Sequence, residues 1–212
     1  MKPKTDTTPY KGHFAFYVSA LIVSLLVFVT GAAVAYHKTI VTGWEQSLFL
    51  SVNGWPEGLY KPMMFATFFG TAWAAATSVA AAFFARYYKL AGRLALSILA
   101  GYGLTVVFKG LVGRDRPEGL IDGTILRTIE PAMGYPSTHT AIATIIFLTL
   151  LPYLKWRWRW IVPLIVAVVA VSRVYLGAHL PLDVLGGAAI GTAIVAFVRV
   201  LPQPLRIMLR ID

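Results

Sequence analysis

The sequence predicts an all-α membrane protein: a bundle of six transmembrane helices with a short amphipathic interfacial helix near residues 42–53. Its 212 residues are 58% hydrophobic and only 13% charged, whereas a soluble domain carries about 25% charged residues. The mean hydropathy is +0.70, and apolar stretches alternate with polar or basic segments along the whole chain. Because this composition cannot cover a folded chain with polar surface, we expect a single membrane-embedded domain over residues 1–212.

The first apolar stretch, residues 13–35, is longer than the hydrophobic region of a cleaved signal peptide, so it predicts a transmembrane helix. In the segment that follows, Thr42 and Glu45 fit a capping box, and apolar residues continue at helical spacing as far as Val52. This pattern predicts the interfacial helix, and an ordinary loop is the alternative.

The second predicted span, residues 62–85, is rich in alanine and contains Gly70. Small residues of this kind allow helices to approach closely in lipid. Three basic residues then mark residues 86–93 as a tight turn, and the third span follows at residues 94–112.

The fourth, fifth and sixth spans are predicted at residues 138–154, 161–177 and 182–200. Residues 155–160 alternate basic and tryptophan side chains, which is typical of a membrane interface. The sixth span carries two glycines four residues apart, beginning at Gly187, a spacing that favours close helix packing.

Six spans place both termini on one side of the membrane, and the loop charges indicate which side. Loops on the side of the termini hold twelve basic and two acidic residues: Lys2, Lys4, Lys11, Arg86, Lys89, Arg93, Lys155, Arg157, Arg159, Arg199, Arg206 and Arg210 against Asp6 and Asp212. The opposite loops hold seven of each: Lys38, Lys61, Lys109, Arg114, Arg116, Arg127 and Arg173 against Glu45, Glu57, Asp115, Glu118, Asp122, Glu130 and Asp183. The positive-inside rule therefore predicts cytoplasmic termini, and it accounts for the net charge of +10 without a nucleic-acid partner.

Three polar clusters fall at span ends on the predicted extracytoplasmic side. Lys109, Arg116 and Arg173 supply cations suited to phosphate oxygens. Ser137 is a predicted helix N-cap, which would leave the amides of residues 137–139 free to bind an anion. Ionisable groups beside apolar spans usually indicate function, although Lys109, Arg114 and Arg116 could instead form a lipid-headgroup patch.

Two histidines in these clusters, His139 and His179, can serve in proton transfer and nucleophilic attack. Asp183 follows His179 by four residues, and Pro181 between them can begin a helix, so the carboxylate can reach back and fix the tautomer of the imidazole. Glu130 shortly precedes the second cluster and is either a solvated loop acid or a substrate contact. The chain has no cysteine, which excludes thiolate nucleophiles and cysteine-ligated metals.

Together the clusters resemble the three signature motifs of the type 2 phosphatidic acid phosphatase superfamily. In this chain the motifs read Lys109-x6-Arg116-Pro117, Pro136-Ser137-x-His139 and Ser172-Arg173-x5-His179-x3-Asp183. The resemblance implies that His179 is the nucleophile, that Asp183 orients it and that His139 is the acid and base. It assigns phosphate binding to Lys109, Arg116, Ser137, Thr138 and Arg173. No metal or other cofactor is implied.

One position departs from the family pattern, because Thr138 stands where the family usually has glycine. A positive φ at this position would strain a threonine, whereas a first helical residue after the Ser137 cap would not. We expect the second situation, with the Thr138 hydroxyl available to a phosphate.

The expected activity is metal-independent hydrolysis of a terminal phosphate from a membrane lipid, through a phosphohistidine at the extracytoplasmic face of the cell membrane. Candidate substrates are phosphatidate, phosphatidylglycerol phosphate and a polyprenyl diphosphate such as undecaprenyl diphosphate. One alternative is a lipid phosphotransferase that uses the same site, and another is a non-enzymatic membrane transporter. The oligomeric state is left open, and a lateral gate is expected near residues 42–53.

Overall fold

The computed structural model describes residues 11–36, 41–131, 133–201 and 205, and side chains from residue 14 onward. All regular secondary structure within these residues is helical. Several charges used to predict orientation lie outside the described residues or their described side chains: Lys2, Lys4, Asp6, Lys11, Lys38, Arg206, Arg210 and Asp212.

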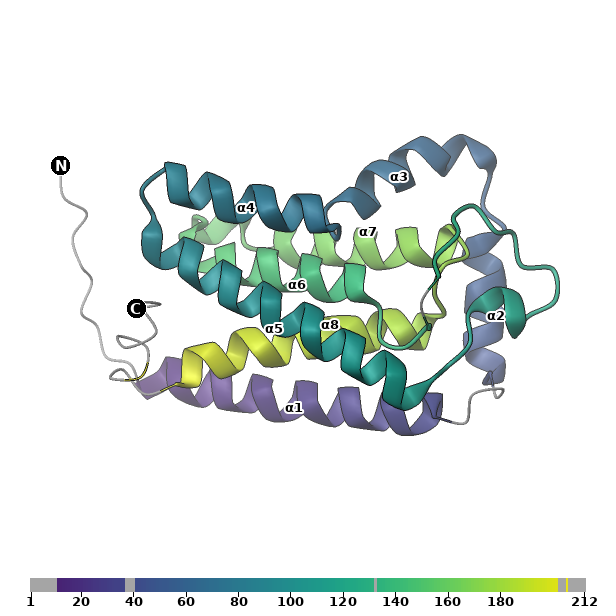
Figure 1. Ribbon diagram of the computed structural model, residues 1–212, viewed down its shortest axis with the longest axis horizontal. Helices are drawn as coiled ribbons and strands as arrows, with labels where there is room; N and C mark the ends of the chain where they lie inside the picture. Colours follow the sequence, from purple (N-terminus) through teal and green to yellow (C-terminus); the bar gives the residue numbers. More distant parts are fainter. Residues whose placement is uncertain (1–10, 37–40, 132, 202–204, 206–212) are drawn as a thin grey trace.

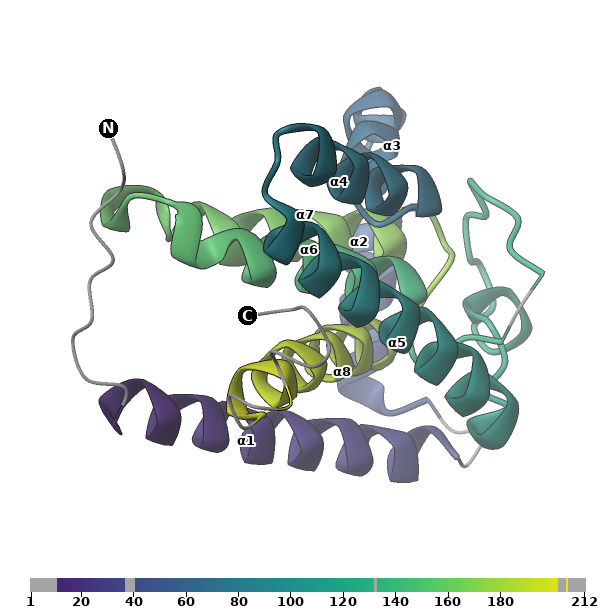
Figure 2. The same ribbon diagram turned by 60° about the vertical axis from the view of Figure 1, so that its left-hand side comes forward.

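The long helices run side by side, with α6 in the middle of the bundle and α8 packed between α1 and α6 (Figure 1, Figure 2). They are α1 Lys11–Ala35, α5 Tyr88–Val112, α6 Thr138–Leu150, α7 Ile161–Tyr175 and α8 Pro181–Val200. Short 3₁₀ turns lie at Glu57–Leu59, Pro117–Gly119, Leu151–Tyr153 and Trp156–Trp158.

Four helical segments among the described residues are long and apolar enough to cross a membrane, and a bent pair makes up to five. They contain α1, α5, α7 and α8, and the bent pair is α3 with α4. The chain is therefore a multi-pass membrane protein. The predicted count of six is reached only if the shorter α6 is also counted as a span.

The predicted second span is broken into two helices. Residues 62–85 divide into α3 Tyr60–Phe68 and α4 Ala72–Phe84, and the chain bends by 47° at the break. The break lies against α6, because a Cβ atom on Gly70 would come within 2.4 Å of the carbonyl oxygen of His139. Thr71 then starts α4 by accepting a hydrogen bond from the amide of Ala74.

The predicted basic turn over residues 86–93 is also too long. Helix α5 begins at Tyr88, six residues before the predicted start of the third span. The chain reverses within residues 85–87 because Arg86 adopts a left-handed conformation with a φ of 63°. Lys89 and Arg93 consequently lie in the first turns of α5.

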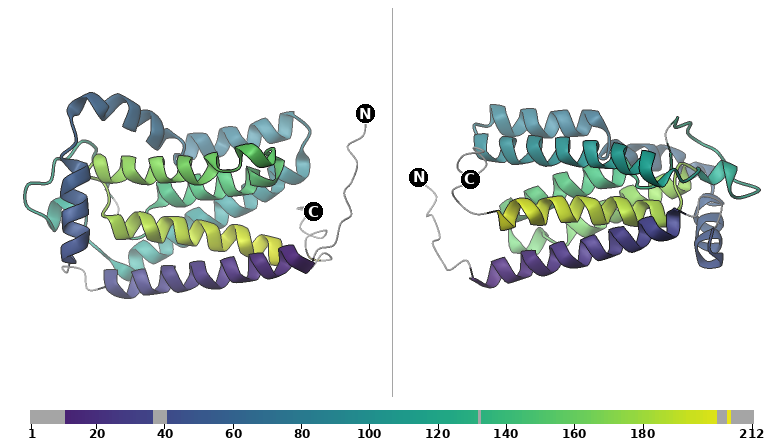
Figure 3. Two further views of the ribbon diagram at one scale, coloured as in Figure 1. Left: turned by 180° about the vertical axis from the view of Figure 1, so that it is seen from behind. Right: turned by 60° about the horizontal axis from the view of Figure 1, so that its bottom comes forward.

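The predicted interfacial helix exists as α2, Gly43–Asn53, and it lies crosswise at one end of the bundle (Figure 3). The predicted capping box is absent, because the Thr42 side chain makes no cap hydrogen bond. Glu45 is turned inward instead, where it binds Arg114. The charged hydrogen bonds between Glu45 and a buried guanidinium outweigh the weaker contribution of a cap.

The paired glycines of α8 form its contact with α6, as their spacing predicts. A Cβ atom on Gly187 would lie 2.3 Å from the carbonyl oxygen of Ser137, and one on Gly191 would lie 2.8 Å from that of Ala141. Both obstacles are backbone atoms, which cannot move aside as a flexible side chain can. The start of α6 is therefore held against α8 without intervening side chains.

Replacement of Gly187 by alanine should force α6 and α8 apart and lower the melting temperature in detergent. Overpacking of this kind costs about 1–3 kcal/mol. Gly103→Ala is the matched control, because a Cβ atom at that position in α5 meets nothing within 4 Å. The control should be neutral or stabilising, and equal melting temperatures for the two variants would contradict the close contact.

Candidate active site

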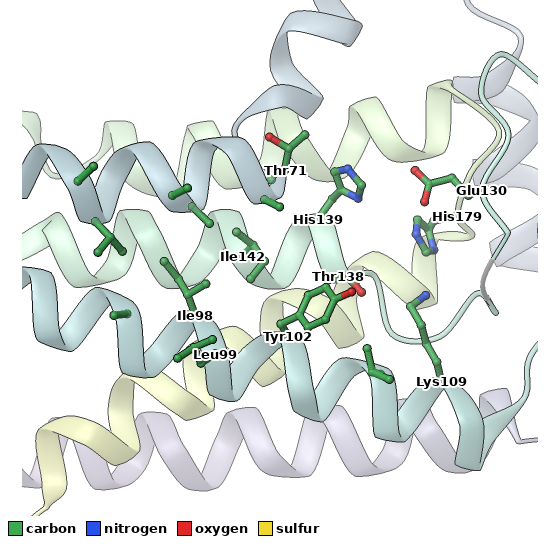
Figure 4. Close-up of a pocket in the computed structure, with 18 of the residues that line it drawn as sticks. Thr71, Ile98, Leu99, Tyr102, Lys109, Glu130, Thr138, His139, Ile142 and His179 are labelled. Atoms are coloured by element: carbon green, nitrogen blue, oxygen red, sulfur yellow. The ribbon is translucent and has the colours of Figure 1, made fainter. Parts of the chain in front are cut away.

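The three polar clusters meet at one end of the bundle, the end that α2 crosses and that lies away from the start of α1 (Figure 1). The last turn of α5 carries Lys109, and the last turn of α7 carries Arg173. Ser137 and the first turn of α6 supply the second cluster, while His179 lies in the connection between α7 and α8. In Figure 4, Lys109, Glu130, His139 and His179 border one space.

The corner between α7 and α8 places His179 beside Asp183. Gly177 turns the chain with a φ of 73°, and the carbonyl of Arg173 accepts hydrogen bonds from the amides of Ala178 and His179. Pro181 begins α8, so Asp183 lies in its first turn. The Oδ2 atom of Asp183 lies 3.4 Å from Nδ1 of His179 and accepts a hydrogen bond of 2.9 Å from the amide of Leu180.

The neighbours of His179 define its tautomer. A guanidinium can only donate hydrogen bonds, and NH1 of Arg116 lies 3.4 Å from Nε2 of His179. This contact favours the tautomer in which Nε2 carries the lone pair and Nδ1, on the side of Asp183, carries the proton. Burial, aided by Lys109, Arg116 and Arg173, holds the pKa of His179 well below its ordinary value, so the imidazole is neutral at pH 7.

The cations around His179 already hold an anionic group from the chain itself. Arg173 donates hydrogen bonds to the carboxylate of Glu130 and to the hydroxyl of Thr67. NH2 of Arg116 lies 3.7 Å from the same carboxylate. Burial alone would raise the pKa of Glu130, but Arg173, His139 and His179 together outweigh burial and the pKa is lowered. Glu130 is thus a site residue, and its carboxylate marks a position that two guanidinium groups offer to an anion.

Lys109 extends the cationic surface from the α5 side. Its ammonium group donates to the carbonyl oxygens of Met133 and Gly134, and the side chain is largely buried. These bonds direct the group toward the space that His139 and His179 line (Figure 4). A buried ammonium beside two arginines is favourable chiefly when an anion is shared among them.

Ser137 caps α6, because its hydroxyl oxygen accepts hydrogen bonds from the amide and the hydroxyl of Thr140. Thr138 is the first residue of the helix, and Arg86 is the sole non-glycine residue with a positive φ in the described part of the chain. A threonine therefore fits position 138 without backbone strain. Its hydroxyl donates to Thr105 on α5 at 3.2 Å, so it ties α6 to α5.

Two residues of the site were not identified from the sequence. The sequence pattern is compatible with Arg114 in a lipid-headgroup patch and predicts Glu45 in a helix cap, yet the two form a fully buried ion pair. Helical spacing could have revealed Glu45, because it shares a face of α2 with the buried Phe49 and Val52. A carboxylate on the apolar face of a helix requires a buried partner.

An apolar groove leads away from the two histidines. It has a volume of about 1000 Å³ and runs between α4, α5 and α6, from His139 and His179 to Phe83 and Phe84 (Figure 4). Its walls are mostly alanine and aliphatic side chains of α4 and α5. No residue of the 42–53 segment lines it, so the expected lateral gate is not at this groove.

Metal-ligand geometry is not found near this site. Within the ranges that the structure describes, no group of three or more His, Cys, Asp or Glu side chains is arranged to hold a metal ion. The positive charge at the site comes from Lys109, Arg116 and Arg173.

Comparison with known proteins gives the class of the chain. Residues 90–207 match the PAP2 superfamily. This region is more than half of the 212 residues and contains all three motifs, so the chain belongs to the PAP2 superfamily. The family resemblance carried by the motifs is thereby confirmed.

Individual relatives narrow the comparison. The undecaprenyl-diphosphatase of Sulfolobus acidocaldarius is 36% identical over 111 residues, which are 51% of this chain and 53% of that protein. The chain thus matches about half the length of this curated relative.

Two crystal structures share the fold. LpxE of Aquifex aeolicus superposes with a TM-score of 0.68 and 25% identity, over 74% of this chain and 95% of that one. A PAP2 type phosphatidylglycerolphosphate phosphatase of Bacillus subtilis superposes with a TM-score of 0.67 and 25% identity, over 84% and 93%.

The neutral state of His179 predicts a pH dependence of folding stability. The unfolded imidazole binds a proton below about pH 6.5, whereas the folded one stays neutral because its pKa is lowered. The unfolded state then binds more protons, so stability should fall by about 1 kcal/mol from about pH 7.5 to about pH 5.5 on account of this residue. Melting temperatures in detergent should fall more steeply for wild type than for His179→Gln, and parallel curves would contradict a neutral buried His179.

Proposed function

We propose that this chain is a lipid phosphate phosphatase, with a polyprenyl diphosphate as the first substrate to test. One observation carries the proposal: Nε2 of His179 lies beside a cationic cradle at the mouth of an apolar groove. The cradle, Lys109, Arg116 and Arg173, suits the oxygens of a phosphate, and the groove suits a hydrocarbon chain. Membership of the PAP2 superfamily and a relative named undecaprenyl-diphosphatase support the same reading.

In the first step of the proposed reaction, Nε2 of His179 attacks phosphorus and the bond from phosphorus to the lipid-side oxygen breaks. His139 gives its proton to the leaving oxygen, and a phosphohistidine forms. Asp183 accepts the Nδ1 hydrogen bond and stabilises the positive charge on the ring. In the second step His139 takes a proton from water, the oxygen attacks phosphorus, and the bond from phosphorus to Nε2 breaks. Inorganic phosphate leaves, and the electron pair that returns to Nε2 restores neutral His179.

Charge stabilisation falls to the three cations of the cradle. Phosphoryl transfer depends mainly on positioning and on neutralising the equatorial oxygens, and preorganised cations provide both. An arriving phosphate replaces the Glu130 carboxylate as the partner of Arg173 and Arg116. Every step of the proposed reaction is carried out by side chains of the protein.

For orientation we propose that the site faces the extracytoplasmic side and that both termini are cytoplasmic. The loops at the site end have balanced charge, whereas basic residues such as Arg86, Arg157 and Arg159 gather in loops of the other set. The lipid headgroup would then react at the outer interface while its chain stays between α4, α5 and α6.

Phosphate release from lipid phosphates should require both histidines. We expect purified wild type in detergent with excess chelator to release phosphate from undecaprenyl diphosphate, with phosphatidylglycerol phosphate and phosphatidate as comparison substrates. His179→Ala should lose about 10⁴-fold or more of kcat, and His139→Ala about 10²- to 10⁴-fold. Activity that survives in His179→Ala would refute the nucleophile, and loss of wild-type activity under chelator would refute the metal-free reaction.

Vanadate extends the same experiment to orientation. As a five-coordinate mimic of phosphorus, it should inhibit wild type when added outside right-side-out vesicles that exclude it from the lumen. Inhibition confined to inverted vesicles would reverse the proposed orientation, and insensitivity of the detergent-solubilised enzyme would count against the site.

The groove predicts a dependence on chain length. Ala76→Phe narrows the groove, whereas Ala81→Phe places the same side chain on α4 outside the lining residues. We expect Ala76→Phe to lower kcat/KM about tenfold for undecaprenyl diphosphate and to leave a short-chain, water-soluble diphosphate unaffected. An equal effect of the two variants, or an equal effect on both substrates, would place the lipid chain elsewhere.

A further inference from the structure

Behind His179 lies a second charged cluster, and Asp183 is its only member with a role in the proposed reaction. The guanidinium of Arg114 is enclosed by two carboxylates, and all three side chains are 0% exposed. Its NH1 atom lies 2.9 Å from Oε1 of Glu45 and 3.0 Å from Oδ1 of Asp183, and its NH2 atom lies 2.7 Å from Oε2 of Glu45. Arg114 therefore binds Glu45 through both terminal nitrogens and Asp183 through NH1 alone.

The cluster divides the Asp183 carboxylate between two tasks. Oδ1 accepts from Arg114, while Oδ2 accepts from the amide of Leu180 and faces Nδ1 of His179. Because a hydrogen bond holds each oxygen, rotation of the carboxylate plane away from the imidazole would break at least one of them. Arg114 thus determines how Asp183 presents its second oxygen to His179.

Glu45 fixes the cluster to the start of α8. The same Oε1 atom that accepts from Arg114 also accepts a hydrogen bond of 3.0 Å from the amide of Leu182. Leu182 immediately precedes Asp183, so Glu45 of α2 binds the helix turn that carries the Asp183 carboxylate. The bidentate pair of hydrogen bonds between Arg114 and Glu45 sets the plane of the guanidinium.

We infer that Glu45 and Arg114 are positioning residues for the phosphatase reaction, which act on His179 through the carboxylate of Asp183. Neither residue lines the groove or the cradle, so neither touches the substrate. The inference rests on the proposed function, in which Asp183 orients and stabilises the nucleophile. A merely structural ion pair would support folding but would leave the alignment of His179 unchanged.

Glu45→Gln and Arg114→Lys test the inference, because each keeps most of the side-chain volume and removes one feature of the cluster. Glutamine lacks the negative charge of Glu45, and lysine cannot form the bidentate hydrogen bonds of Arg114. In wild type and both variants we would measure kcat and KM for the lipid diphosphate in detergent. The expected result is a fall in kcat of about 10- to 100-fold, with KM within about twofold of wild type because substrate contacts are intact.

The matched controls are Glu57→Gln and Arg127→Lys. Arg127 and Glu57 also form an ion pair between the chain that follows α2 and the loop before α6, but Glu57 is 71% exposed and the pair contacts neither His179 nor Asp183. These controls should retain the kcat of wild type. Equal losses of kcat in the controls would assign the effect to general weakening of this end of the bundle.

A double-mutant cycle with Asp183→Asn separates positioning from structure. If Glu45 acts through the carboxylate, Glu45→Gln should lower kcat further by less than about twofold in the Asp183→Asn background. An undiminished loss in that background would overturn the inference. Melting temperatures identify variants that fail to fold. If either Glu45→Gln or Arg114→Lys fails to fold, the other still tests the inference.

The outcomes also separate this inference from the proposed function. If wild type releases phosphate and His179→Ala does not, while Glu45→Gln and Arg114→Lys keep the kcat of wild type, the positioning role alone is wrong. If wild type releases no phosphate from any lipid phosphate, the proposed function is wrong and the positioning role is wrong with it.

Discussion

A charge in a space without water is stable only when other charges surround it, and this constraint organises the functional end of the protein. Arg114 satisfies it with Glu45 and Asp183, and Arg173 satisfies it with Glu130. Removal of one partner from such a pair leaves an uncompensated charge and costs about 3–5 kcal/mol. The two pairs differ in what completes them. The Arg114 pair is closed within the protein, whereas the Glu130 carboxylate is partly exposed and can be exchanged for an incoming anion.

That difference divides the site into a fixed part and an exchangeable part. In the fixed part, hydrogen bonds from Arg114 and from the amide of Leu180 hold Asp183. The connection between α7 and α8 holds His179. On the exchangeable side, Arg116, Arg173 and Lys109 face the groove, where a phosphate can take over the bonds that the chain now provides. Preorganised groups of this kind stabilise developing charge without rearranging at the moment of reaction. The apolar groove begins beside them, so the polar and hydrocarbon parts of a lipid meet their matching surfaces side by side.

The sequence predicted the helical class, the order of the spans, the Ser137 cap and the helix start at Pro181, because each depends on local chemistry. It failed where distant contacts decide. The break at Gly70 depends on the backbone of His139, and the inward turn of Glu45 depends on Arg114, 69 residues away. Capping propensity is worth about 1 kcal/mol, so a buried ion pair easily overrides it. The roles of the eight predicted site residues stay predictions, although the structure brings their clusters to one end of the bundle.

The position of Glu45 early in the chain has a consequence for biogenesis. Domains form from the N-terminus during synthesis, so α2 emerges long before either of its polar partners. Glu45 meets Arg114 only after α5 has been made, and the amide of Leu182 only when α8 begins. Until α5 has been made, the carboxylate of Glu45 must remain hydrated at the membrane surface. Helix α8 therefore completes the site: a nascent chain that stops before α8 contains every cation of the cradle but lacks Asp183, which orients the nucleophile.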